Sequence, residues 1–166
     1  RPAPGFIQGW HDLQFQIAQG ELKQIHIRVP EHVVVTGARG IALGAWRFDP
    51  ETRTFEGRLS RAVSGMYQLN LTTQISAAQL PYDVAIGAIV VDHASRQRGR
   101  LALLTHSAVH ASVLDHPQEM NVDDLARDAT QLLASIPEYH RGDVQLAYRA
   151  PVDEQMLSMQ VAAVKP

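Results

Sequence analysis

Alternation of apolar and polar residues, most regular between residues 45 and 71, constrains the fold of this chain more than any other feature. Trp46 and Phe48 alternate with polar neighbours, and the pattern resumes at Phe55 and Leu59 after an Asp-Pro-Glu-Thr sequence. Asp and Pro favour a turn here, because the carboxylate can bond nearby backbone and proline fixes φ. Period-two alternation on both sides of a turn predicts a β-hairpin whose aromatic side chains share one face.

Strand patterns also occupy most of the remaining chain. A second turn is predicted at Ser64-Gly65, so that a third strand at residues 66–71 completes a meander. Residues 6–17 have spacing that is helical at first and alternating later, and both interpretations stay open. The other predicted strands are residues 21–29, 32–36, 72–78, 84–91, 143–150 and 156–164, of which the last two are predicted to form a terminal hairpin around residues 151–154.

The strongest helix signal lies at residues 121–135. Asn121 is suited to the N-cap position, Asp123 and Asp124 fall in the first turn where the helix dipole favours anions, and Pro137 ends the segment. The predicted fold class is therefore mainly β (β-rich α+β). It is predicted to form two small β modules, residues 1–78 and residues 79–166, with the helix in the second.

Composition excludes several classes of protein. A net charge of −2, from 15 Lys and Arg against 17 Asp and Glu, argues against a dedicated nucleic-acid binder. The longest apolar runs fall well short of the roughly 20 residues that a membrane span needs. There is no cysteine for disulfides or thiolate chemistry. The sequence begins at Arg1 without an initiator Met, which predicts a mature secreted chain or an excised domain.

Histidines supply the one candidate for metal chemistry. His106 and His110 are four residues apart, with His116 beyond them and Asp92-His93 upstream. On a helix the first two would share a face and could reach one zinc ion, but on a strand they would lie about 13 Å apart. The glutamate of the zincin pattern is missing, so ordinary histidines are favoured over a metal site.

Other patterns are weaker still. The sequence has no G-x-S-x-G nucleophile motif, and Gly37-Ala38-Arg39-Gly40 lacks the lysine of a phosphate-binding loop. Two further surfaces were considered as recognition sites: a basic cluster at Arg96, Arg98 and Arg100, and an aromatic stripe at Trp10, Trp46, Phe48 and Phe55. No catalytic, cofactor-binding or metal-binding residue is assigned from the sequence.

Two stretches carry a resemblance to a known family. Residues 46–59, WRFDPETRTFEGRL, resemble a hairpin of the flagellar P-ring assembly chaperones (the FlgA family), and residues 140–151, HRGDVQLAYRAP, resemble that family's C-terminal SAF-type β-clip. Residues 80–90 and the 121–133 segment follow in the same order as in the family. The resemblance covers about half the chain.

The resemblance implies a non-enzymatic assembly chaperone of the periplasm, without a cofactor. Its partner would be a protein, namely a ring- or assembly-forming subunit, bound at exposed strand edges or in a groove between the two modules. Two alternatives stay open: a metal-dependent enzyme centred on His106, His110 and His116, and a structural subunit of a secretion or pilus apparatus.

Overall fold

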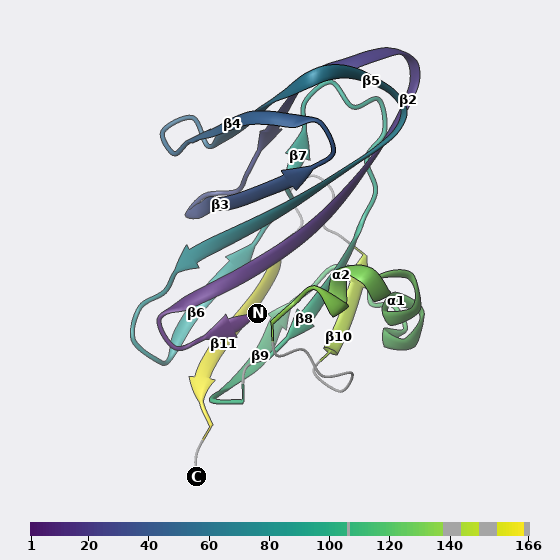
Figure 1. The fold of residues 1–166 in the computed structure, drawn as a ribbon. Helices are drawn as coiled ribbons and strands as arrows, with labels where there is room; N and C mark the ends of the chain where they lie inside the picture. The colour runs from purple at the N-terminus through teal and green to yellow at the C-terminus, as the bar shows by residue number, and fades with distance from the viewer. Residues whose placement is uncertain (106, 138–143, 150–155, 165–166) are drawn as a thin grey trace. The chain divides into compact units, whose positions relative to one another are not determined.

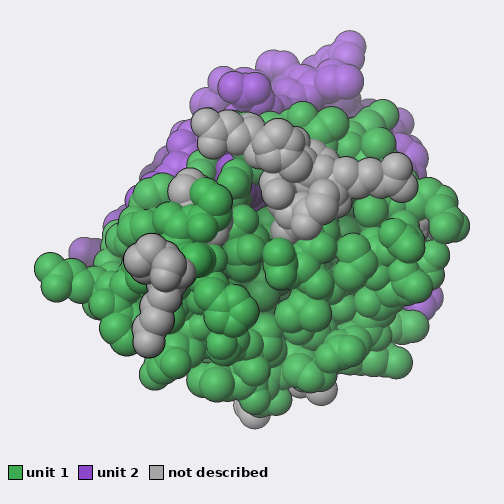
Figure 2. Space-filling model, turned by 90° about the horizontal axis from the view of Figure 1, so that it is seen from below, with its two compact units in different colours: residues 1–8, 75–88, 98–166 green, residues 9–74, 89–97 purple. Residues whose placement is uncertain are grey.

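The computed structural model describes residues 1–105, 107–137, 144–149 and 156–164. The chain is mainly β with two short helices, as the sequence predicts (Figure 1). It forms two compact units: residues 1–8, 75–88 and 98–164 contribute to unit 1, and residues 9–74 and 89–97 to unit 2 (Figure 2). The units therefore differ from two consecutive modules divided at residue 78, because the chain passes between them four times.

Unit 1 contains a three-stranded antiparallel sheet with β11 (Leu157–Ala163) at its centre, between β6 (Tyr82–Ile86) and β9 (Val109–Asp115). A separate antiparallel pair joins β8 (Arg100–Leu104) to β10 (Val144–Arg149), and the two-residue β1 (Pro2–Ala3) pairs with the start of β2 (Phe6–Arg28). The core of unit 1 collects buried side chains from these strands: Ile7, Tyr82, Leu103, Val109, Tyr148, Leu157, Met159 and Val161.

The predicted terminal hairpin is wrong. β10 pairs with β8, whereas β11 pairs with β6 and β9, so the last two strands lie in different sheets. Both segments alternate, but alternation fixes which face a strand buries and leaves its partner unspecified. The turn predicted at 151–154 and the 140–143 part of the β-clip-like stretch lie outside the described residues.

The predicted helix exists in two pieces, α1 (Val122–Asp128) and α2 (Thr130–Ala134). Asn121 is the N-cap of α1, and its side-chain oxygen accepts a hydrogen bond from the Asp123 amide at 2.8 Å. The hydroxyl of Thr130 donates to the carbonyl oxygen of Ala126 at 2.9 Å, a local bond that competes with regular helix.

Unit 2 is built on most of two strands of 23 residues each, β2 (Phe6–Arg28) and β5 (Thr54–Ser76), which are neighbours in one sheet; residues 9–28 and 54–74 of them belong to this unit. Phe15 contacts Tyr67, while His26 lies 3.9 Å from Glu56, so the two strands run in opposite directions. The ambiguous 6–17 segment is thus a strand and is continuous with the strand predicted at 21–29. The turn predicted at Ser64-Gly65 is wrong, because β5 runs through it.

Three shorter strands complete the sheet of unit 2. β3 (Val33–Gly40) and β4 (Leu43–Asp49) both pair with β5, and β7 (Val90–Val91) pairs with the end of β2. The predicted β4–β5 hairpin is confirmed, with Phe48 opposite Phe55. Its turn is held by the Asp49 carboxylate, which accepts hydrogen bonds from the Glu51 and Thr52 amides at 2.9 and 3.4 Å. These bonds lower the pKa of Asp49.

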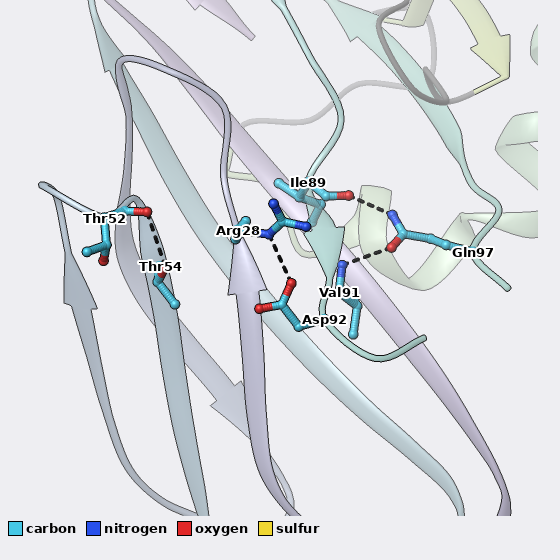
Figure 3. A network of polar contacts seen from close by, with 7 residues as sticks. All are labelled: Arg28, Thr52, Thr54, Ile89, Val91, Asp92 and Gln97. Carbon is cyan, nitrogen blue, oxygen red and sulfur yellow. Dashed lines mark hydrogen bonds and ion pairs between the residues drawn. The ribbon is translucent and has the colours of Figure 1, made fainter. Parts of the chain in front are cut away.

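Residues 89–97 belong to unit 2 although they come late in the chain. Figure 3 shows the contacts that fix them: Arg28 donates to the Asp92 carboxylate at 2.9 Å, and the Gln97 side chain accepts from the Val91 amide and donates to the Ile89 carbonyl. Asp92 therefore anchors this segment to β2, and Gln97 ties its end back to residues 89 and 91.

Candidate functional site: a groove at the bend of β5

The geometry of β3 and β4 forces β5 to bend. β3 reaches β5 at Gly40, where an added Cβ would lie 3.1 Å from the carbonyl oxygen of Gln68, and β4 pairs Leu43 with Leu59. The chain from Gly40 to Leu43 spans at most about 11 Å. A straight β5 would place Leu59 and Gln68 about 30 Å apart. The β5 residues between Leu59 and Gln68 must therefore curve away from the straight path along which β3 and β4 pair with this strand.

Glycines mark where the long strands change direction. Gly65 of β5 has φ +73° and Gly20 of β2 has φ +77°, in the left-handed region that glycine adopts without steric strain. In Figure 1 the ribbons of β2 and β5 curve over together in unit 2. Ser64-Gly65 therefore changes the direction of the chain, as the sequence indicates. The change is a bend within β5 and not a turn between two strands.

An open groove of about 880 Å³ lies at this bend. Its walls come from the end of β3 and from residues 61–70 of β5, with one residue of β2. The described residues that line it are Gln14, Arg39, Gly40, Ile41, Arg61, Ala62, Val63, Ser64, Met66, Tyr67, Gln68 and Asn70. All of them belong to unit 2.

One edge of β5 is unpaired along the groove. The Ser60 amide donates to the Ala42 carbonyl at 2.7 Å, the last contact from the β4 side, and β3 ends beside Gln68. Among the described residues no strand pairs with residues 61–66 on this edge. Unpaired backbone amides and carbonyls of this kind are a template for adding a strand from another chain.

The groove also holds a buried polar group without a partner. The hydroxyl of Tyr67 is buried beside Gly40 and makes no hydrogen bond to any described residue. Burial raises the pKa of this phenol. A buried hydroxyl without a partner costs about 1–3 kcal/mol. A Cβ at position 40 would overlap the Tyr67 oxygen, so a larger residue there would require the Tyr67 side chain or the backbone to shift.

The charged side chains of the groove are positive. Arg39 and Arg61 are exposed and have no ion-pair or hydrogen-bond partner among the described residues. None of the described lining residues is acidic. The neighbouring Asp12 carboxylate is already held by the side-chain amides of Gln68 and Asn70, at 2.8 and 3.5 Å. The groove therefore offers two free guanidinium groups to a ligand.

Large apolar side chains stand exposed beside these arginines. Ile41 is 76% exposed and Met66 is 66% exposed. With the arginines and the open strand edge, they give the groove three kinds of contact: apolar, cationic and backbone. Such a surface is suited to binding an extended peptide.

The predicted aromatic stripe is not a single exposed surface. Phe55 is fully buried, and Trp46 packs on it with ring centroids 5.8 Å apart. Trp10 and Phe48 are half-buried. Most of this aromatic area serves packing, as is usual for aromatics at strand spacing.

The arginine cluster is divided between the units. Arg96 belongs to unit 2, whereas Arg98 and Arg100 belong to unit 1. All three are exposed.

The histidines form no metal site in the described part of the chain. His106 lies outside the described residues, and His110 is exposed on β9. The His116 ring contacts the Pro117 carbonyl at 2.7 Å, the Glu119 carboxylate at 3.4 Å and the Tyr148 ring. No group of three His, Asp or Glu side chains among the described residues could hold a metal ion.

A fourth histidine, His11, makes a buried polar pair with Thr73. Its Nε2 lies 2.8 Å from the Thr73 hydroxyl, which is itself buried. Burial of the imidazole lowers the pKa of His11 to about 4, so the ring is neutral at pH 7. The pair links β2 to β5 as a structural contact.

Sequence analysis did not single out Ile41, Arg61 or Met66 as candidate site residues. It considered Arg39 only within a segment that lacks the lysine of a phosphate-binding loop. The groove depends on where β3, β4 and β5 meet, and the available signal was limited to Gly65 within an alternating run.

No protein-family model matches the chain, and comparison with curated proteins and with solved structures gives no significant match. None of the helices in the described parts of the chain is long and apolar enough to cross a membrane.

Proposed function

We propose that the protein is a non-enzymatic binding protein of the periplasm that assists assembly of a ring- or assembly-forming subunit. The observation that carries this proposal is the groove at the bend of β5, where an unpaired strand edge lies among exposed Arg39, Arg61, Ile41 and Met66. The sequence resemblance to flagellar P-ring assembly chaperones supports the same class of function. Strand edges of this kind bind partner chains through backbone hydrogen bonds.

Photocrosslinking tests this proposal. A photoreactive amino acid replaces Met66 in the groove, and in a control protein it replaces Leu114 in unit 1, which is equally exposed (66% and 65%). Each purified protein is irradiated in a periplasmic extract of the source bacterium, and the products are identified by mass spectrometry. We expect one defined partner from position 66, which is absent from position 114 and is a subunit of an oligomeric assembly.

Three results would contradict the proposal. Identical products from positions 66 and 114 would mean that the groove has no specific partner. Crosslinks between copies of the protein itself would favour the alternative of a structural subunit. Recovery of the native protein in the cytoplasmic fraction would exclude a periplasmic assembly factor.

A further inference from the structure

We propose that the groove at the bend of β5 binds an extended, acidic segment of its partner, with alternating carboxylate and apolar side chains, as an added strand beside residues 61–66. This inference rests on the proposed function as a binding protein and specifies the chemistry of the bound segment. It is argued from the strand edge, from the charge of the groove and from its apolar side chains.

The open edge of β5 requires an extended ligand. β4 covers this edge up to Leu59, and β3 covers it again from Gln68. A short strand placed between them would continue the sheet and pair with backbone groups that have no partner within the described chain. A helix or a compact ligand has no free backbone groups with which to make these bonds.

The charge of the groove selects acidic side chains. Arg39 and Arg61 have no described partner, and the Asp12 carboxylate nearby is occupied by two amide groups. A guanidinium group binds a carboxylate through two parallel N–H···O bonds, which gives geometric specificity as well as energy. A basic segment would meet two uncompensated positive charges.

Exposed Ile41 and Met66 favour apolar side chains in the bound segment. Successive side chains of a strand point to opposite faces, so a segment that alternates acidic and apolar residues can present one kind to each face. Methionine is flexible and polarisable, and it adapts to apolar groups of different shape. Among the described lining residues, Ile41 and Met66 are the large apolar side chains that stand exposed, and a bound segment would cover them.

Two labelled heptapeptides test the proposal. The first alternates glutamate and valine, and the second alternates lysine and valine as the matched basic control. Fluorescence anisotropy measures the affinity of each peptide for the intact protein. We expect the glutamate peptide to bind at least tenfold more tightly than the lysine peptide and to weaken as salt rises, since exposed ion pairs are screened.

Variants locate the binding site. The double variant Arg39→Glu/Arg61→Glu should lose at least tenfold in affinity for the glutamate peptide. Arg96→Glu is the control, because Arg96 is an exposed arginine of unit 2 outside the groove and has no described partner. Circular dichroism and the thermal midpoint report whether each variant is folded, and the single variant Arg61→Gln replaces the double variant if that one unfolds.

The outcomes separate this inference from the proposed function. Equal affinity for the two peptides, or equal effects of the groove variants and Arg96→Glu, would overturn the acidic-segment inference. If position 66 still crosslinks a specific partner in that case, the proposed function stands. If the peptide dissociates a dimer of the protein into monomers, as measured by sedimentation velocity, a second copy of the protein fills the groove. That result would overturn both the acidic-segment inference and the proposed function.

Discussion

Two strands of the molecule, β11 in unit 1 and β5 in unit 2, differ in how their edges are covered. β11 has a neighbour on each side, and its residues Leu157, Met159 and Val161 are fully buried. β5 is covered by β3 and β4 near its two ends and is open between them, where Met66 is 66% exposed. The backbone of β11 is therefore paired on both edges within its sheet, whereas β5 combines an open backbone edge with an exposed apolar side chain, the two features of the candidate binding surface.

Replacement of two methionines by alanine gives the largest predicted difference in the free energy of unfolding. Met159→Ala empties a fully buried position and should lower the free energy of unfolding by about 2–5 kcal/mol. Met66→Ala removes an exposed side chain and should change it by less than about 0.5 kcal/mol. Urea denaturation of both variants measures the difference. A large loss for Met66→Ala would mean that the groove is part of a core.

The His11–Thr73 pair should make stability depend on pH. The folded pKa of His11 is about 4, below the ordinary 6.5, so the unfolded chain binds a proton more readily between these values. The neutral His11 ring therefore contributes roughly 3 kcal/mol to the free energy of unfolding. This contribution is complete above pH 6.5 and is lost as the pH falls toward 4. Urea denaturation at pH 7 and pH 4.5 measures this loss. His11→Gln, which does not titrate, should reduce it, and an unchanged loss would refute the assignment to His11.

Gly40 and Tyr67 should be coupled at the wall of the groove. Gly40→Ala would push a Cβ against the Tyr67 oxygen and should destabilise the protein by about 1–3 kcal/mol. Tyr67→Phe removes that oxygen and its unsatisfied hydroxyl, so it should be neutral or stabilising. In the double variant most of the penalty of Gly40→Ala should disappear. Additive effects in a double-mutant cycle would rule out the close contact.

The smallest predicted effect is the difference in stability between a variant that removes an ion-paired arginine and a variant that removes an arginine without a described partner. Arg47 forms an ion pair with Glu56 at 2.6 Å, and Arg47→Ala should cost about 0.2–1 kcal/mol at low salt. Arg61→Ala should leave stability unchanged within measurement error, because Arg61 has no described partner. Thermal unfolding at low and high salt compares the two variants. A salt-dependent loss for Arg61→Ala would show that this arginine already has a carboxylate partner within the chain.

Much of the fold could be predicted from local sequence patterns. Alternation predicted the β class, the Asp49 turn predicted the β4–β5 hairpin, and Asn121 predicted the start of the helix. These features depend on interactions between residues close together in the chain. The assignment to an assembly chaperone stays a prediction.

Strand partners and the groove depend on contacts between distant residues, which alternation does not specify. β10 and β11 are close in sequence, yet each pairs with an earlier strand. The Ser64-Gly65 sequence suits both a turn and a bend. One sequence signal did favour a continuous strand: the apolar residues Phe55 and Leu59 and the later Tyr67, Leu69 and Leu71 are all odd-numbered, as one uninterrupted strand requires.

Amide hydrogen exchange, with and without the glutamate–valine peptide, tests the central claim most directly. Strand addition at the groove would give the β5 amides that face the open edge new hydrogen-bond partners. We therefore predict slower exchange within residues 61–66 when the peptide is bound, with no change in β11. Unchanged exchange in residues 61–66 at saturating peptide, or protection confined to other segments, would contradict the claim.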